Sequence, residues 1–284
     1  MAENVFVVLG GGGIKGMAHA GAWRAIEETG LGVTEILGTS IGGLVAACLA
    51  GGMGWPRLYE LAHVFKKRDI VALNRWALLF NGIRQPSVFQ GEPLRNFINT
   101  VLPVARFDEL NLAVSVNAVD LETGKTKWFG AAGDMTVPVA DAVYATCALP
   151  LFYPPAEING ELYVDGGVND GLPIELAAAR GATLIIAIDV GAGELRDSGD
   201  TVAKGLVAIH HRVGEIMGYA RKRALLENWA GPRLIYVRPR LDAYSTFDFG
   251  RTDFFLDEGY RATREALVEA GYLLAAEAAR RARG

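Results

Sequence analysis

The sequence predicts an α/β fold of three layers, in which helices cover both faces of a mostly parallel central sheet. Short apolar, β-branched runs alternate with longer amphipathic stretches along the chain, and this order of elements is typical of a parallel sheet. The first run, Val5–Leu9, is apolar at every position, as expected of a strand buried on both faces. No linker-like segment divides the 284 residues, so we expect a single domain over residues 1–284.

The predicted elements follow one another along the whole chain. Helical patterns cover residues 17–28, 41–50, 56–65, 90–101, 139–145, 202–229 and 257–283, with a further helix after Pro173. Strand patterns follow the first run at residues 35–38, 111–119, 125–129, 162–164, 184–189 and 234–237. We expect the strand at 125–129 to return antiparallel to its predecessor, and Asn159-Gly160 to mark a hairpin turn.

Composition and charge exclude several classes of protein. Hydrophobic residues make up 51% of the chain, and the net charge of −4 gives no electrostatic basis for binding nucleic acid. Cys48 and Cys147 lie in apolar stretches without metal-ligand spacing, which suits a reducing compartment. The N-terminus has no positive region, and no apolar run is long enough to span a bilayer. We therefore expect a cytoplasmic protein, with peripheral contact with a membrane left open.

Two segments have competing interpretations that bear on this membrane contact. The apolar stretch from Ile70 to Phe80 is expected to be a core-packing helix, and the alternative is a lid or a wall for an acyl chain. The arginines Arg280, Arg281 and Arg283 either contact a membrane or complement the C-terminus of the last helix.

The loop after the first strand contains Gly11-x-Gly13-x-x-Gly16. This spacing suits either the pyrophosphate of a dinucleotide or a set of backbone N–H donors for an oxyanion. A dinucleotide site calls for an acidic residue at the end of the second strand, which ends instead in Gly38-Thr39-Ser40. The sequence therefore favours the oxyanion interpretation.

The second strand runs directly into a helix through Gly38-x-Ser40-x-Gly42, the spacing of a nucleophile elbow. A serine on such a sharp turn needs small neighbours, because side chains two residues away would collide. The helix start behind Ser40 would favour developing negative charge. The alternative is an ordinary glycine-rich turn capped by Ser40.

A serine hydroxyl needs a base to become a nucleophile. All four histidines (His19, His63, His210 and His211) fall in helical patterns, where packed or solvated roles are the rule. A triad of Ser40, Asp165 or Asp189, and His210 or His211 satisfies the chain order of an α/β-hydrolase, but we do not favour a mid-helix histidine.

Asp165 is the better candidate for the base. It ends a strand-like run, and Gly166-Gly167 after it allow a tight turn at the edge of the sheet. Partial burial beside Ser40 would raise the pKa of this carboxyl and make it a better base. The alternative is an ordinary turn aspartate. Asp189 also ends a strand, and we interpret it as structural.

Three motifs occur in order: residues 11–16, residues 38–42 and Asp165-Gly166-Gly167. Together with the approach at residues 145–155, they resemble the patatin-like phospholipase family over residues 5–189. The family often has a serine where this chain has Thr146 or Cys147, and we expect that difference to affect packing alone.

The resemblance implies a lipid ester hydrolase of the phospholipase A or lysophospholipase type. Ser40 would be the nucleophile and Asp165 the base, without histidine, metal or cofactor. The amides of Gly11, Gly12 and Gly13 would form the oxyanion hole, and Lys15 would position the loop. Supporting positions would be Lys15, Gly16, Gly38, Gly42, Gly166 and Gly167. The expected partner is a lipid or ester substrate; a nucleotide-binding protein, a histidine-triad esterase and a non-catalytic relative stay as alternatives.

Overall fold

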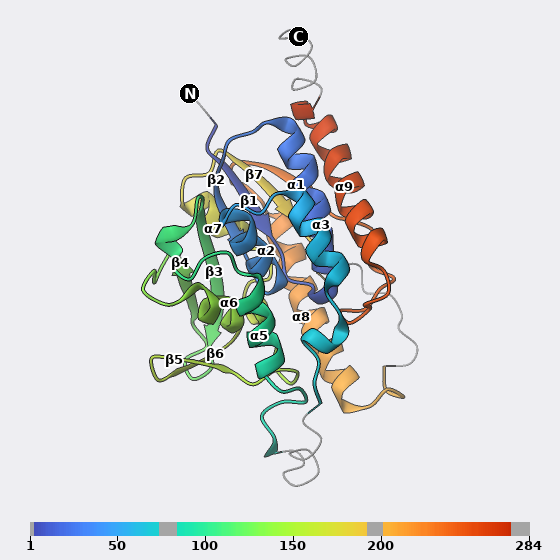
Figure 1. Cartoon of the computed structure of the whole chain (residues 1–284). Coiled ribbons are helices and arrows are strands. Elements are labelled where there is room, and N and C mark those ends of the chain that lie inside the picture. Colours follow the sequence, from blue (N-terminus) through green and yellow to red (C-terminus); the bar gives the residue numbers. More distant parts are fainter. Residues whose placement is uncertain (1–2, 74–83, 192–200, 274–284) are drawn as a thin grey trace.

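The computed structural model describes residues 3–73, 84–191 and 201–273 (Figure 1). In these residues the strands form one sheet in the order β5-β6-β3-β2-β1-β7-β8, and β4 pairs with β3. The strands are β1 (Val5–Leu9), β2 (Val33–Gly38), β3 (Ala113–Asp120), β4 (Thr126–Gly130), β5 (Ala156–Ile158), β6 (Glu161–Asp165), β7 (Leu184–Ile188) and β8 (Arg233–Val237).

The sheet is mixed. Strand β1 pairs parallel with β2 and β7, and these pair parallel with β3 and β8 in turn. On the other side, β4 and β6 run antiparallel to β3, and β5 runs antiparallel to β6. The hairpin turn between β5 and β6 has Asn159 and Gly160 at positive φ, as the sequence predicts.

Helices cover both faces of the sheet, which confirms the predicted fold class. In β1, Val5, Val7 and Leu9 point into the larger core and Phe6 and Val8 into the smaller one. The larger core includes residues of α1 (Met17–Thr29), α2 (Ile41–Ala50), α3 (Trp55–Val64), α5 (Glu92–Val101), α6 (Val139–Cys147) and α9 (Thr252–Glu269). The smaller core lies beneath α7 (Ile174–Ala179) and the end of α8 (Leu206–Glu227).

Helices α1 and α9 pack unusually closely, side by side in Figure 1. A Cβ on Gly21 would lie 1.9 Å from the carbonyl oxygen of Leu256, and one on Gly259 would lie 2.0 Å from that of Ala18. The two backbones therefore approach each other at glycines that tolerate no side chain.

Two predicted helices are wrong in part. The residues from Ile70 to Leu73 are not helical, because their backbone pairs with other segments: Leu73 bridges to Phe89, and the carbonyl oxygen of Ala72 accepts the N–H of Gln90 at 2.8 Å. Residues 74–80 lie outside the described residues.

The last helix, α9, begins at Thr252 and ends at Glu269, not at residues 257 and 283. Gly271 has φ 86°, a left-handed conformation that ends a helix. Arg280, Arg281 and Arg283 lie outside the described residues. Among the helices that the structure describes, none is both long and apolar enough to cross a bilayer.

Candidate active site

Ser40 lies on a sharp turn between β2 and α2, with φ 54° and ψ −129°. Residues other than glycine rarely adopt a positive φ, so the turn holds this serine in a strained conformation. A Cβ on Gly38 would lie 2.5 Å from the carbonyl oxygen of Gly42, and one on Gly42 would lie 2.1 Å from that of Leu9. The predicted elbow geometry is confirmed, and close backbone contacts require both flanking glycines.

Asp165 ends β6 and its side chain is buried. Its Oδ1 accepts the N–H of Gly167 at 2.8 Å, in the short turn η5 (Gly166–Val168). A Cβ on Gly166 would lie 2.2 Å from Oδ1 of Asn117. The turn after Asp165 therefore excludes a side chain at residue 166.

The structure brings Ser40 and Asp165 together at one edge of the sheet. Burial raises the pKa of Asp165 to about 6, while the nearby Ser40 hydroxyl and the hydrogen bond from the Gly167 N–H act in the opposite direction. A carboxylate with a pKa near 6 is a stronger base than an ordinary aspartate and is still ionised at neutral pH. The Asp165 carboxylate can therefore accept a proton from the serine hydroxyl.

A buried polar network holds the elbow against β3. Thr39 Oγ1 donates to Oδ1 of Asn117 at 2.9 Å and also lies 3.1 Å from the carbonyl oxygen of Asp170. The amide nitrogen of Asn117 donates to the same carbonyl oxygen at 2.9 Å. Sequence reasoning missed Asn117. Its only signal was a polar residue in the middle of a buried strand.

Thr146 and Cys147, in the last turn of α6, both touch Ser40. Thr146 Oγ1 accepts the N–H of Ser40 at 2.9 Å, and the Ser40 hydroxyl lies close enough to the thiol of Cys147 to affect its pKa. Burial raises the pKa of Cys147, so its thiol is neutral at pH 7. The expectation that these positions affect packing alone is therefore wrong.

The glycine loop passes directly beside the serine and offers backbone donors. A Cβ on Gly11 would lie 3.3 Å from the Cβ of Ser40. The N–H of Gly11 donates to the carbonyl oxygen of Gly171 at 3.1 Å. In the described part of the chain, the N–H groups of Gly12 and Gly13 donate to no acceptor. Of the three predicted donors, these two are available to an oxyanion.

Lys15 is buried under the glycine loop, at the end of the short turn η1 (Gly13–Gly16). Its Nζ lies 3.5 Å from the carbonyl oxygen of Gly191, and burial lowers its pKa. A Cβ on Gly12 would lie 2.5 Å from the carbonyl oxygen of Val190. Residues 190–191 and Lys15 thus lie against the glycine loop.

Asp189 holds the segment of residues 190–191 in place beside the glycine loop. Its Oδ1 accepts the N–H of Gly191 at 3.0 Å. Burial alone would raise the pKa of Asp189, but Lys222 and Arg238 hold it below its usual range. Asp189 therefore has a structural part in the fold, as expected. Its Oδ2 lies 2.5 Å from Lys222 Nζ, 2.6 Å from Arg238 Nη1 and 2.5 Å from the Tyr236 hydroxyl.

The histidines make other contacts. Within the described residues, none of the four forms a hydrogen bond with Ser40. Burial lowers the pKa of His19 to about 4, so it is neutral at pH 7. His19 Nε2 lies 2.8 Å from the Gly10 carbonyl oxygen, His63 Nε2 2.7 Å from Asp253 Oδ1, and His211 Nε2 3.4 Å from Thr246 Oγ1, while His210 is exposed.

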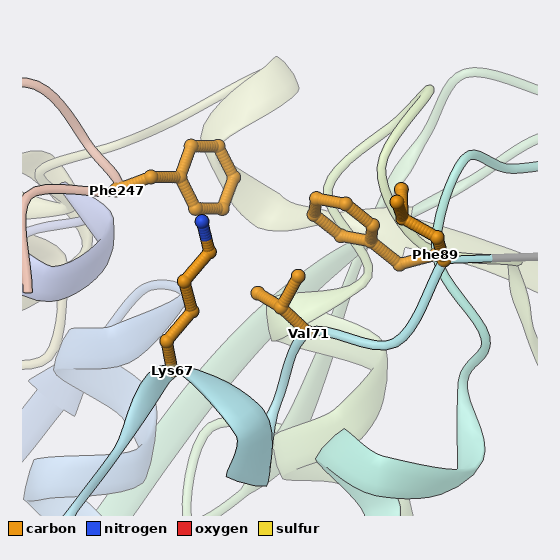
Figure 2. A pocket seen from close by; sticks show the side chains of 5 residues that line it. Lys67, Val71, Phe89 and Phe247 are labelled. Atoms are coloured by element: carbon orange, nitrogen blue, oxygen red, sulfur yellow. The ribbon is translucent and has the colours of Figure 1, made fainter.

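An apolar cavity of about 550 Å³ lies near the glycine loop, lined by Lys67, Val71, Leu73, Phe89 and Phe247. Figure 2 shows the Lys67 amine reaching towards the ring of Phe247. The neighbouring Thr246 accepts the N–H of Ile14 at 3.0 Å through its carbonyl oxygen, and its side chain occupies the space that a Cβ on Gly13 would need. The loop that carries Phe247 therefore connects the cavity to the proposed donor loop.

Comparison with known proteins gives three findings. The family model described as patatin-like phospholipase matches residues 7–178. Lysophospholipase NTE1 of Candida albicans is 29% identical over 277 residues, which cover 88% of this chain and 19% of that protein. An uncharacterised NTE family protein of Mycobacterium tuberculosis is 30% identical over 228 residues, which cover 79% of this chain and 60% of that protein. The chain thus spans less than two thirds of either relative.

The crystal structure of VipD from Legionella pneumophila is similar in fold, with a TM-score of 0.54 and 14% sequence identity. The match covers 95% of this chain and 67% of that one. At this level of identity the similarity concerns the fold alone.

Proposed function

The chain belongs to the patatin-like phospholipase family, and from this premise we propose that it hydrolyses carboxylic esters of lipids with Ser40 as nucleophile and Asp165 as general base. The observation that supports the proposal is the proximity of the two: the hydroxyl of the strained Ser40 acts on the buried carboxyl of Asp165, whose pKa burial raises to about 6. No imidazole among the described residues shares that hydroxyl.

In the proposed reaction, Asp165 takes the proton of Ser40 as the serine oxygen attacks the ester carbonyl carbon. The tetrahedral intermediate collapses, Asp165 returns the proton to the leaving alcohol, and an acyl-serine remains. Asp165 then accepts a proton from water as the water attacks the acyl carbonyl, and it passes this proton to the serine oxygen as the fatty acid leaves. The same carboxylate thus acts as base and acid in alternate steps.

The oxyanion would be held by the N–H groups of Gly12 and Gly13 rather than by that of Gly11, which is bonded to Gly171. Donors already aimed at the developing charge contribute about 3 kcal/mol each to transition-state stabilisation. The start of α2 beside Ser40 adds a favourable dipole.

The cavity favours a lipid with one long apolar chain. Its volume of about 550 Å³ lies in the range of small-molecule pockets, and four of its five lining residues are apolar. Within the described residues Lys67 is in no ion pair, so its ammonium is available to an anionic headgroup such as the phosphate of a lysophospholipid. This choice of substrate agrees with the name of the Candida relative.

A fluorophosphonate probe tests the nucleophile directly. We expect one labelled serine, mapped by mass spectrometry to Ser40, and no label in Ser40→Ala. Labelling elsewhere, or none on protein that hydrolyses p-nitrophenyl esters, would refute the assignment. Binding of ATP or NAD at micromolar concentration would instead support the nucleotide-binding alternative.

The substrate class has a separate test. Lys67→Ala should raise KM for a lysophospholipid and leave KM for a neutral monoacylglycerol unchanged, with Lys66→Ala as the control, since Lys66 is outside the cavity lining. An equal change for both substrates would remove Lys67 from headgroup recognition.

A further inference from the structure

Helix α8 has its apolar side towards solvent. Leu206 is 74% exposed, Val213 is 49% exposed and Met217 is 60% exposed, and the helix has no buried residue. Ile209 and Ile216 are also exposed. An ordinary surface helix has the opposite arrangement, with its apolar residues against the core.

These exposed residues form one continuous stripe, which we call the α8 stripe: Leu206, Ile209, Val213, Ile216 and Met217. Their spacings of three and four residues place them on one side of a helix with 3.6 residues per turn. The stripe runs for about 16 Å along the helix axis, at 1.5 Å per residue.

Polar contacts hold the opposite side of α8 against the body of the protein. Lys222 reaches Asp189, and His211 lies 3.4 Å from Thr246 Oγ1. Apolar packing against the sheet comes only at the end of the helix, where Leu225 and Leu226 meet the smaller core. Folding of the described chain therefore does not account for the apolar character of the stripe.

The stripe lies in a basic part of an otherwise acidic chain. Residues 204–223 contain five lysines and arginines and one acid, Glu215, whereas the whole chain carries a net charge of −4. Glu215 pairs with Arg212 at 3.3 Å. Beyond this range, Glu227 pairs with Arg223 at 2.7 Å. Lys222 is turned away from the stripe towards Asp189, so within this stretch of the described chain Lys204 and Arg221 are the cations that form no ion pair. An apolar stripe with this small excess of cations suits a surface that is both apolar and anionic.

The stripe is also near the site. His211, one helical turn or less from Ile209 and Val213, packs against Phe152 with ring centroids 5.9 Å apart, and Phe152 lies 4.8 Å from Phe247 of the cavity. Figure 1 shows the first half of α8 at the lower end of the view, towards which the chain also runs after α3, through the turn η2 (Lys67–Asp69). The helix that carries the stripe therefore packs, on its other side, against aromatic residues that reach the cavity.

We propose that α8 docks this protein on an anionic lipid bilayer, with the α8 stripe inserted at the level of the headgroups. A second copy of the chain is a poorer occupant. Paired α8 helices would bring their excess cations together, and one further turn of the same spacing would place Arg223 in the seam. The docking does not depend on the proposed chemistry, because it concerns binding alone.

The test compares two methionine variants in vesicle co-sedimentation. Met217→Glu places a charge in the stripe, whereas Met135→Glu changes a methionine of similar exposure, 48%, outside α8. We expect the wild type and Met135→Glu to bind vesicles of phosphatidylcholine with phosphatidylglycerol. Met217→Glu should bind about tenfold more weakly, since it loses apolar burial and adds repulsion. Binding of the wild type should weaken with salt.

A soluble short-chain ester supplies the control for folding: both variants should hydrolyse it at the wild-type rate if the fold is intact, and circular dichroism gives the same information should the protein lack esterase activity. Equal vesicle binding by the two variants would overturn the proposal. A wild-type dimer in sedimentation velocity that Met217→Glu dissociates would also overturn it, in favour of a second copy as the occupant.

Discussion

The Ser40 hydroxyl lies close enough to the Asp165 carboxyl to lower its pKa, although β2, which precedes Ser40, and β6, which ends at Asp165, do not pair and are separated by β3 in the sheet. Strand β3 makes the contact possible, because it pairs parallel with β2 and antiparallel with β6. The end of β2 and the end of β6 are thereby brought together across one strand.

Removal of either member of this pair should abolish ester hydrolysis. Ser40→Ala lacks the nucleophile, and Asp165→Asn lacks the base, which contributes about 10²- to 10⁴-fold to the rate. We expect kcat on a p-nitrophenyl acyl ester to fall by at least about 100-fold in Asp165→Asn. His211→Ala is the matched control and should keep wild-type kcat. If it loses as much activity as Asp165→Asn, the base is a histidine.

The pH dependence of activity should report the ionisation of Asp165. Only the carboxylate can accept the serine proton, and burial raises its pKa to about 6. We expect kcat/KM to increase with pH and to level off above an apparent pKa of about 6. A rising limb centred near 4 would mean that Asp165 is not the group that titrates.

Because its pKa is raised, the ionised Asp165 carboxylate lowers the free energy of unfolding at neutral pH. Its pKa is higher in the fold (about 6) than in the unfolded chain (3.8), so the folded state binds more protons between these pH values. The contribution of this residue to stability is present below pH 4 and is lost as the pH rises through about 6. At pH 7 that loss amounts to about 3 kcal/mol, from about two pKa units.

We therefore expect Asp165→Asn to be inactive and more stable than the wild type at pH 7, by up to about 3 kcal/mol in urea unfolding. The gain should shrink towards pH 4. His19 acts in the opposite direction, because its pKa of about 4 in the fold is below its usual 6.5 and its contribution is lost as the pH falls. A variant destabilised at pH 7 would show that the ionised carboxylate is favourable in its site.

The site residues that stand in tight turns between glycines could be predicted from the sequence. Ser40 and Asp165 each stand beside glycines that the structure shows to be in close backbone contact, at Gly38, Gly42 and Gly166. Such requirements are local, so a short motif records them. The strands were predictable for a similar reason, since burial on both faces leaves an uninterrupted apolar run.

Residues whose role depends on distant contacts could not be predicted. Asn117 meets Thr39 and Asp170 only after the sheet has formed, and Phe247 reaches the cavity from a loop after the last strand. The exposure of the apolar face of α8 could not be predicted either. Periodicity identifies an apolar face of a helix but does not show whether that face meets the core or the solvent.

We expect buried Asp189 to stabilise the fold through its ion pairs with Lys222 and Arg238. Asp189→Asn leaves the ammonium of Lys222 and the guanidinium of Arg238 without their shared counterion, and breaking a buried pair in this way costs about 3–5 kcal/mol. We expect a loss of that order in urea unfolding. The double change Asp189→Asn with Lys222→Met should recover part of it. An additive result would mean that the two residues do not stabilise the fold as a pair.

Two glycine-to-alanine changes should have opposite effects on stability. A Cβ on Gly259 would lie 2.0 Å from the carbonyl oxygen of Ala18, so Gly259→Ala must push α9 away from α1. Such overpacking costs about 1–3 kcal/mol. Gly218, an exposed residue of α8, has open space around its Cβ position, and Gly218→Ala should stabilise the helix by up to about 1 kcal/mol. Thermal unfolding of both variants measures the difference. A Gly259→Ala protein as stable as Gly218→Ala would show that α1 and α9 are not in close backbone contact.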